Sequence, residues 1–188
     1  MAETISATEA RHLLEQGNAR YMAATANDGD IGPELRQHLS DHGQHPYAAI
    51  ITCSDSRVVP EHIFMAGLGQ LFTVRVAGNI VGATQMACAV YGVEHLGAKL
   101  VVVLGHTACG AVAAALEGDV EGCLHELVGP IREAIGDETD PTRASIANLE
   151  RQVQVLRTHP EMAQLMEKEG VEVVGALYQV DTGVVSWL

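Results

Sequence analysis

The sequence is poor in basic residues. Its 188 residues include 11 lysines and arginines against 24 aspartates and glutamates, which gives a formal net charge of −13 at pH 7. Nucleic acids and anionic membranes bind to basic protein surfaces, so this balance argues against both as partners. Beyond that, the acidity indicates little more than solubility.

Long apolar runs are also missing. No stretch approaches the roughly 18 consecutive apolar residues that a membrane-spanning helix needs. The opening MAETISATEA has neither the basic nor the apolar region of a secretory signal. Hydrophobic residues make up 47% and charged residues 19% of the chain, as in a globular protein of one compact domain. We therefore expect a cytoplasmic protein.

Cysteine is scarce. The chain has four, too few to form a disulfide framework in a chain of this size: Cys53, Cys88, Cys109 and Cys123. In a cytoplasmic protein, cysteines near a histidine more often serve as metal ligands or catalytic groups. Cys88 falls within a helical pattern and Cys123 in the stretch after Gly118, and both are expected to be inert.

What is present is an alternation of strand and helix patterns. Apolar runs predict strands at 46–53, 70–79 and 98–106, and a strand, turn and short strand at 171–188. Capping residues, prolines and apolar spacing predict helices at 6–21, 33–39, 84–96 and 109–118, from Pro141 onward, and at 160–170. Strands separated by helices predict an α/β fold with a mainly parallel sheet of about four strands, a C-terminal hairpin strand and an N-terminal helical arm.

Unusual residues follow two of these strands. Cys53 ends the first strand in IITCSDSRVVP, and His106 ends another in GHTACGA. Ligands of parallel sheets gather beyond the carboxyl ends of the strands. In an extended segment, Cys53, Asp55 and Arg57 project to one side. His106 and Cys109, three residues apart, would share one face of a helical turn.

Two thiolates and one imidazole suit a tetrahedral zinc ion with an open fourth position. Asp55 is placed to reach that position or to hold the water there. Arg57 would pair with Asp55 and keep its carboxylate ionised. The helix that begins near Cys109 would point its N–H groups at the site, which favours a thiolate.

The segments CSDSR and HTACGA together resemble the zinc site of the β-class carbonic anhydrases, and the likeness covers roughly residues 44–115. The closing YQVDTGVV is similar to that family's C-terminal hairpin. The resemblance implies one Zn²⁺ per chain, held by Cys53, His106 and Cys109, and by Asp55 only in a closed state. It also implies reversible hydration of CO₂ to bicarbonate and a proton, in which a zinc hydroxide, oriented by the Asp55–Arg57 dyad, attacks CO₂.

The resemblance assigns further residues. Gln44 matches a glutamine that hydrogen-bonds bicarbonate, Phe72 and Tyr91 match residues lining the cleft, and Gly110 follows the last ligand. It implies a homodimer or homotetramer with the active site at the dimer interface and the helical arm embracing the neighbouring protomer. The single domain would then comprise an arm at 1–43, a zinc-site core at 44–136, and C-terminal helices and hairpin at 137–188.

Other readings stay open. The same scaffold and ligands would serve a hydrolase of carbonyl sulfide or carbon disulfide, or a non-catalytic module that binds zinc or bicarbonate. Thiol redox chemistry between Cys53 and Cys109 is a further alternative. The plainest reading makes the cysteines buried apolar groups and Asp55 and Arg57 a structural ion pair. Arg75, within the second strand, is expected to form a structural salt bridge near the dimer contact.

Overall fold

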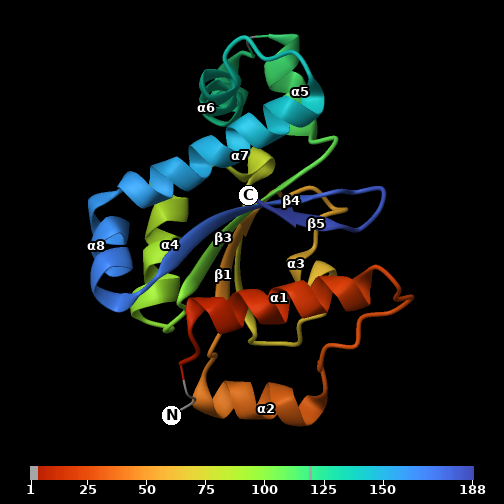
Figure 1. The fold of residues 1–188 in the computed structure, drawn as a ribbon, viewed down its shortest axis with the longest axis vertical. Coiled ribbons are helices and arrows are strands. Elements are labelled where there is room, and N and C mark those ends of the chain that lie inside the picture. Colours follow the sequence, from red (N-terminus) through yellow and green to blue (C-terminus); the bar gives the residue numbers. More distant parts are fainter. Residues whose placement is uncertain (1–3, 119) are drawn as a thin grey trace.

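A five-stranded sheet forms the centre of the molecule (Figure 1). The computed structural model describes residues 4–118 and 120–188, so the first three residues of the predicted arm and Asp119 lie outside the described residues. The strand order is β2-β1-β3-β4-β5. The strands are β1 (Ala48–Thr52), β2 (Leu71–Arg75), β3 (Leu100–His106), β4 (Glu172–Tyr178) and β5 (Val185–Trp187). The first four run parallel and β5 pairs antiparallel with β4, which confirms the predicted α/β fold.

The two central strands explain why their sequences are so apolar. Every residue of β1 and of β3 is buried, because helices cover both faces of the sheet. In the register between them, Thr52 lies opposite Leu104. The residues that follow these two positions therefore emerge side by side at the carboxyl edge of the sheet.

Helices cover the two faces of the sheet in separate layers (Figure 1). One face packs against α1 (Ala7–Tyr21) and α3 (Pro60–Ile63) through a core that includes Leu14 and Phe64. The other packs against α4 (Ala83–Glu94), α7 (Pro141–Thr158) and α8 (Pro160–Glu169). Successive side chains of each strand point to opposite faces of the sheet and pack alternately into these two cores.

The predicted N-terminal helix is present and covers a face of its own chain's sheet. The capping box is confirmed: the Ser6 hydroxyl accepts from the Glu9 N–H at 3.2 Å, and the Glu9 carboxylate accepts from the Ser6 N–H at 2.9 Å. Gly17 lets α1 approach α3 closely, since a Cβ there would lie 1.8 Å from the Phe64 carbonyl oxygen. The second helix of the arm, α2 (Pro33–His42), has no buried residue.

A third cluster of helices lies beyond the carboxyl edge of the sheet. It comprises α5 (Gly110–Glu117), the short turns η1 (Ala77–Asn79) and η2 (Gly122–Leu124), and α6 (His125–Ile135). Apolar side chains of α5 and α6 share a core cluster with the two buried cysteines, Cys53 and Cys109. Neither α3 nor α6 is among the helices predicted from the sequence. The strand predicted at 70–79 is too long, because β2 ends at Arg75 and the chain then turns through η1.

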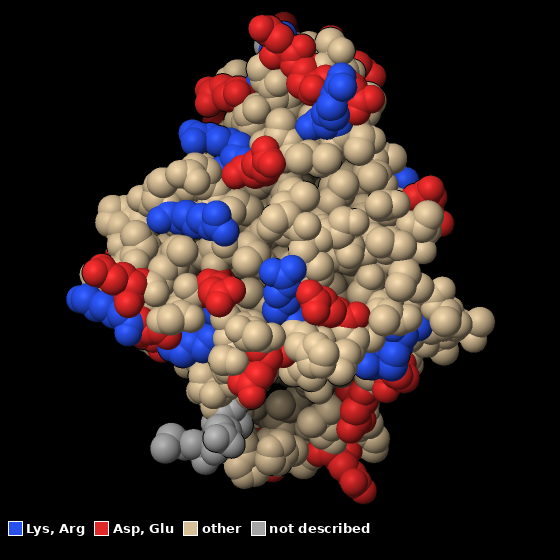
Figure 2. All heavy atoms as spheres, in the orientation of Figure 1, with Lys and Arg blue, Asp and Glu red and all other residues tan. Residues whose placement is uncertain are grey.

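The surface carries mixed charges. On the face drawn in Figure 2, acidic side chains are spread over the molecule, and the basic ones occur singly or in small groups. This distribution agrees with the net charge of −13 and offers no broad basic surface on that face. Among the described residues, none of the helices combines the length and the apolar composition needed to cross a membrane.

Candidate metal centre

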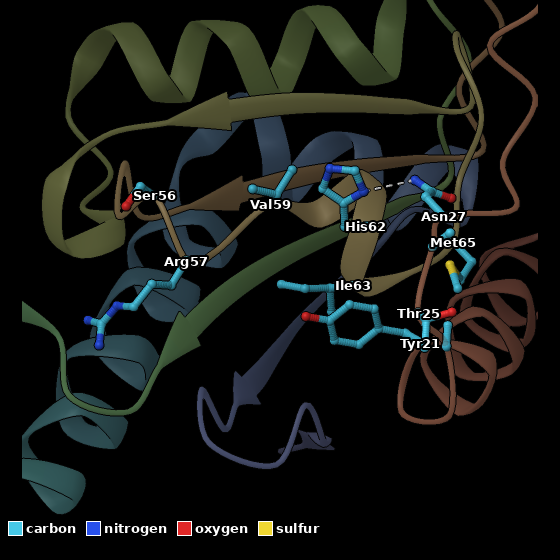
Figure 3. Close-up of a pocket in the computed structure, with 11 residues that line it drawn as sticks. Tyr21, Thr25, Asn27, Ser56, Arg57, Val59, His62, Ile63 and Met65 are labelled. Carbon is cyan, nitrogen blue, oxygen red and sulfur yellow. Dashed lines mark hydrogen bonds between the residues drawn. The ribbon is translucent and has the colours of Figure 1, made fainter.

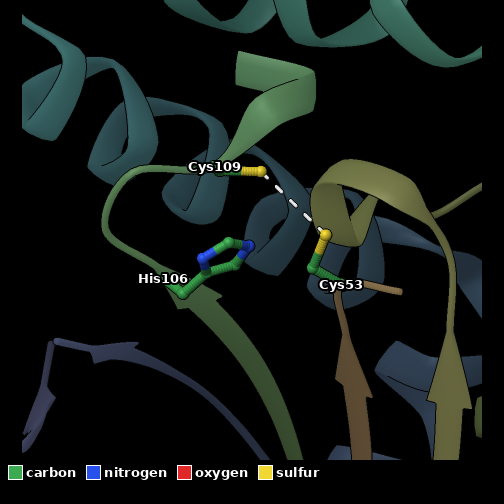
Figure 4. A group of neighbouring side chains, drawn as sticks. All are labelled: Cys53, His106 and Cys109. Carbon is green, nitrogen blue, oxygen red and sulfur yellow. Dashed lines mark hydrogen bonds between the residues drawn. The ribbon is translucent and has the colours of Figure 1, made fainter. Parts of the chain in front are cut away.

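The residues after β1 and at the end of β3 meet as the strand ends predict. Cys53 directly follows β1, and His106 is the last residue of β3. One donor atom from each of Cys53, His106 and Cys109 lies within 4.8 Å of the other two, and all three residues are buried. The two sulfur atoms are 4.0 Å apart (Figure 4). Both thiols are free, and the predicted convergence of the three side chains is confirmed.

The link from His106 to Cys109 differs from the predicted helical turn. Ala108 has a left-handed backbone (φ +54°), which reverses the chain before α5 begins. Cys109 is the N-cap of α5, so the first amides of the helix point toward its sulfur. The Cys109 side chain accepts no capping hydrogen bond, but the nearby N–H groups of Val112 and Ala111 act to lower its pKa against the larger raising effects of Cys53 and burial. The helix start thus faces the cluster as expected, although the preceding residues form a turn.

The Cys53 and Cys109 thiols lie close enough for each to shift the pKa of the other. The Cys53 sulfur accepts hydrogen bonds from the N–H groups of Asp55 (3.4 Å) and Gly78 (3.3 Å). The neighbouring Cys109 thiol has the largest effect on Cys53, and with His106 and the two amides it lowers the pKa of Cys53. Cys53 in turn, together with burial, raises the pKa of Cys109. Without a metal, the two thiols therefore lose their protons in two coupled steps, and the two N–H donors favour the thiolate at Cys53.

His106 presents one nitrogen that needs a partner. Its Nδ1 lies 2.9 Å from the carbonyl oxygen of Thr107, a contact that makes Nδ1 the protonated nitrogen. Nε2 is buried and has no hydrogen-bond partner among the described residues. A buried imidazole nitrogen without a partner is unfavourable, and a metal ion beside two thiolates would satisfy it. The donor set of two sulfurs and one nitrogen therefore fits zinc, with the imidazole oriented by its second nitrogen.

Asp55 and Arg57 form a tight pair within a turn. The extended segment predicted from the sequence is wrong here: the Val58 N–H bonds to the Asp55 carbonyl, and the chain turns back. The Arg57 N–H and Nε both donate to Asp55 Oδ1 at 2.9 Å, and Nη2 donates to Oδ2 at 2.7 Å. These hydrogen bonds, those from the Arg57 side chain above all, hold the pKa of Asp55 well below its usual range.

The Arg57 guanidinium also connects the two loops of the site. Its Nη2 donates to the carbonyl oxygen of Ala108 at 3.0 Å, within the turn that joins His106 to Cys109. The Arg57 side chain therefore fixes the Asp55 carboxylate relative to the turn that carries His106 and Cys109. In this structure both oxygens of Asp55 accept hydrogen bonds from the Arg57 side chain.

Arg75 has a role that the sequence analysis missed. It was expected to form a salt bridge, but it donates to two backbone carbonyls, those of Cys53 (3.2 Å from Nε) and Asp55 (2.7 Å from Nη2). Its side chain thus spans the backbone on either side of Ser54. The only sequence signal was its position at the end of the strand adjacent to β1.

Three other predicted residues lie away from the cluster within this chain. Gln44 is exposed and precedes the amino end of β1, whereas Cys53 follows its carboxyl end. Phe72 pairs with Ala49 near that same amino end, and its ring packs on Tyr91 with centroids 5.9 Å apart. Gly110 does lie at the site, as the exposed first residue of α5.

A cavity lies beside the cluster. Its volume is about 410 Å³, and it is bounded by the end of α1, α3 and the turn at Ser56 and Arg57. Figure 3 shows Tyr21, Asn27 and His62 on its far side, while the Arg57 guanidinium points away from them. None of the three candidate metal ligands lines it, so this cavity adjoins the centre without forming it.

Comparison with known proteins identifies similar chains. The sequence model of the carbonic anhydrase family matches residues 48–185. Carbonic anhydrase 2 of Mycobacterium tuberculosis is 32% identical over 185 residues, covering 90% of this chain and 87% of that protein. A carbonic anhydrase of Pseudomonas aeruginosa is 35% identical over 159 residues, covering 74% and 72% of the two chains.

Solved structures agree with this match. A β-carbonic anhydrase of Aspergillus fumigatus superposes with a TM-score of 0.77 at 31% identity, over 83% of this chain and 81% of that one. A tetrameric β-carbonic anhydrase of Sordaria macrospora gives a TM-score of 0.75 at 29% identity, over 96% and 97%. The family match over most of the chain, the parallel sheet and the convergent thiols and imidazole lead to one conclusion: this chain belongs to the β class of the carbonic anhydrases, a family of zinc enzymes.

Proposed function

We propose that this protein catalyses the reversible hydration of CO₂ to bicarbonate and a proton at the Cys53–His106–Cys109 centre, with Asp55 and Arg57 as its catalytic pair. A zinc ion held by these three donors supplies Lewis acidity, which lowers the pKa of water toward neutrality. The observation that carries the proposal is the Asp55–Arg57 pair next to the cluster. A purely structural metal site has no need of an oriented carboxylate beside it.

Asp55 has spare hydrogen-bonding capacity. An ionised carboxylate offers about four acceptor positions, two on each oxygen. Arg57 occupies both positions on Oδ1 with its N–H and Nε, but only one on Oδ2. The Asp55 side chain is 16% exposed, so solvent reaches it from one side. The second position on Oδ2 is therefore available to accept a hydrogen bond from an O–H of the attacking water, which fixes the orientation of that water.

Arg57 keeps this acceptor in its working state. Because the guanidinium holds the pKa of Asp55 well below its usual range, the carboxylate stays ionised and accepts hydrogen bonds throughout the neutral range. The hydrogen bond from Arg57 to the Ala108 carbonyl then fixes the position of the Asp55 carboxylate relative to the loop between His106 and Cys109. The pair thereby orients the nucleophile, and orientation is a major source of rate acceleration.

The remaining predicted residues need a second copy of the chain. Gln44, Phe72 and Tyr91 lie near the amino end of the sheet, so within one chain the length of β1 separates them from Cys53. We propose that they line the cleft of a neighbouring protomer in a homodimer or homotetramer, with Gln44 binding bicarbonate. The 48% exposure of Tyr91 and the tetrameric relative from Sordaria macrospora support this assembly. A cytoplasmic location remains a prediction.

The decisive experiment is stopped-flow CO₂ hydration on purified protein of known zinc content, at about pH 7 and at a clearly more alkaline pH. We expect rapid hydration at both pH values, because Arg57 holds both oxygens of Asp55, and the carboxylate would then not act as a ligand of a zinc ion held by Cys53, His106 and Cys109. The Asp55→Ala variant should retain one zinc per chain and lose at least about 10-fold in rate, as expected for removing a group that orients the nucleophile. Asp41→Ala, which removes an exposed carboxylate on α2, is the matched control.

Two outcomes would count against the proposal. One zinc per chain without hydration at either pH would leave a sulfide hydrolase or a binding module as the better description, and assays with carbonyl sulfide and carbon disulfide would distinguish these. Full activity in Asp55→Ala would show that the carboxylate is only structural. Hydration confined to the alkaline pH would keep the reaction but place Asp55 on the metal at neutral pH.

A further inference from the structure

A buried polar chain runs from α7 to the candidate ligand Cys53. Gln152 and Asn148 are 3% and 1% exposed, deep in an otherwise apolar part of the molecule. Gln152 Nε2 donates to Asn148 Oδ1 at 3.0 Å, and Asn148 Nδ2 donates to the carbonyl oxygen of Gly78 at 2.8 Å. The N–H of Gly78 in turn donates to the Cys53 sulfur at 3.3 Å. Buried amides are unfavourable unless fully bonded, and these two side chains are bonded along a line that ends at the sulfur.

The backbone conformation of Gly78 depends on hydrogen bonds from other residues. Its φ of +70° is a left-handed conformation that suits glycine, and a Cβ at this position would lie 2.4 Å from Ile131 Cδ1. Glycine is therefore required, but a glycine has little intrinsic preference that would fix its two peptide planes. Asn148 fixes the plane on its carbonyl side, and Cys53 receives the N–H on the other side.

Gln152, at the end of this polar series away from Cys53, is also hydrogen-bonded to the backbone. Gln152 Oε1 accepts a hydrogen bond from the Val81 N–H at 2.9 Å. The side-chain amides of Asn148 and Gln152 on α7 therefore hold the 78–81 segment at both ends. All of this is independent of α1, α2 and the Asp55–Arg57 pair. Asn148 and Gly78, 70 positions apart in sequence, are thus joined next to the Cys53 sulfur.

We infer that Asn148 is a positioning residue for the metal centre, which sets the N–H···S hydrogen bond on Cys53 by holding Gly78; this rests on the proposed role of Cys53 as a metal ligand. A hydrogen bond to a metal-bound thiolate withdraws electron density from the sulfur, so the sulfur donates less to the metal. Two thiolates would otherwise neutralise most of the charge of a zinc ion. Asn148 therefore acts to keep the ion a stronger Lewis acid and to place Cys53 for binding.

The test uses the Asn148→Leu variant, which keeps the branched shape and removes the donor to Gly78. Zinc affinity is measured by competition with a chelator, and the sulfur-to-metal charge-transfer band is recorded after Co²⁺ replaces zinc. We expect the zinc affinity to fall about 10-fold, because Cys53 is no longer held in place for binding and this loss outweighs the stronger donation by the sulfur; this is the lower end of the effect of losing an outer hydrogen bond at a metal site. The charge-transfer band should shift, because its energy depends on the electron density of the sulfur.

The matched control is Ser145→Ala on the same helix. Ser145 is 3% exposed and donates to the Pro141 carbonyl at 2.9 Å, so its loss removes a buried hydrogen bond that does not lead to Cys53. It should lower the thermal stability without moving the Co²⁺ band. Gln152→Met leaves Asn148 in place without its support, and a smaller shift in the same direction is expected; this variant decides the question if Asn148→Leu fails to fold.

An unchanged zinc affinity and an unchanged Co²⁺ band in the folded variants would overturn the inference and leave Asn148 a purely structural residue. Failure of the proposed function itself would be seen in the unmodified protein, not in the variants. If the unmodified protein shows no thiolate-to-Co²⁺ band at all, Cys53 is not a metal ligand, and the proposed function itself is wrong.

Discussion

Arg75 is hydrogen-bonded to the backbone of Asp55 rather than to its carboxylate, with 2.7 Å between Nη2 and the carbonyl oxygen. Its Nε reaches the Cys53 carbonyl as well, so one guanidinium immobilises the short segment that carries a candidate ligand and the candidate catalytic carboxylate. The Asp55 side chain is thereby left free to pair with Arg57.

Replacing Arg75 should therefore impair catalysis without emptying the site. We expect Arg75→Met to keep one zinc per chain and to lower the rate of CO₂ hydration about 10-fold, within the usual range for outer positioning groups. The control is Arg157→Met, which removes the same kind of bond: Arg157 donates to the Val173 carbonyl at 2.9 Å and 2.6 Å, outside the site. Equal losses of rate in the two variants would mean that Arg75 acts only through stability.

Cysteine replacement should separate ligands from bystanders. We expect Cys109→Ser to lose most of its bound zinc, because a serine hydroxyl is a poor substitute for a thiolate in a two-sulfur site. Cys123→Ser changes an exposed cysteine on η2 and should keep one zinc per chain. Atomic absorption on both dialysed proteins measures this. Normal zinc content in Cys109→Ser would remove Cys109 from the ligand set.

The pH dependence of folding should reveal the Asp55–Arg57 pair. The pKa of Asp55 is depressed in the folded protein, so its ionised form stabilises the fold above the unfolded pKa, about 3.9. This stabilisation is lost as the pH falls below about 4 toward the folded pKa. Metal-free Asp55→Asn should therefore be less stable than the metal-free parent at pH 7, and the gap should narrow at about pH 3.

Urea unfolding under reducing conditions at several pH values measures that gap. The metal-free form is needed because acid also releases a metal held by thiolates and imidazole. A gap that stays constant from about pH 7 to about pH 3 would assign the effect of the substitution to packing and not to the carboxylate charge.

Asn18 should be a strong determinant of stability far from the metal centre. It is 6% exposed on α1, and its amide donates to the carbonyls of Gly183 (2.8 Å) and Ile63 (3.3 Å). Its oxygen accepts the N–H of Val185 at 3.0 Å, so it ties α1 to the C-terminal hairpin. Asn18→Ala should lower the free energy of unfolding by about 2–3 kcal/mol, since buried backbone groups lose their partners.

The exposed Gln16→Ala on the same helix is the control, and it should change stability by less than about 0.5 kcal/mol. Both are measured by urea unfolding at one protein concentration, because an oligomer's stability depends on concentration. A loss in Asn18→Ala no larger than in the control would show that solvent replaces the three bonds without cost.

Much of the fold could be predicted because its signals are local. The continuous apolar runs of β1 and β3 and the Ser6–Glu9 capping box each identify an element from a few adjacent residues. The short α3 has only four residues, and α6 contains Pro130 and no side-chain cap, so neither gives such a signal. The turn at Asp55 was missed because the Asp55 side chain accepts the Arg57 N–H, which an alternating strand pattern ignores.

The site was predictable to a similar degree. The convergence of Cys53, His106 and Cys109 follows from the ends of adjacent parallel strands. The contacts of Arg75 and Asn148 with the site join residues that are far apart in sequence, and no local pattern encodes them. Gln44 lies at the opposite end of the sheet, so its predicted role depends on an assembly that a single chain does not show.

The burial of β3 and the exposure of α2 imply very different local opening rates. All seven residues of β3 are buried, whereas none of the ten residues of α2 is. Amide hydrogens in β3 should therefore exchange with solvent deuterium only through global unfolding, and those of α2 through frequent local opening. His106 is the last residue of β3, so the imidazole stays in place while the periphery opens and closes. The metal donors are thus attached to the part of the molecule that should open last.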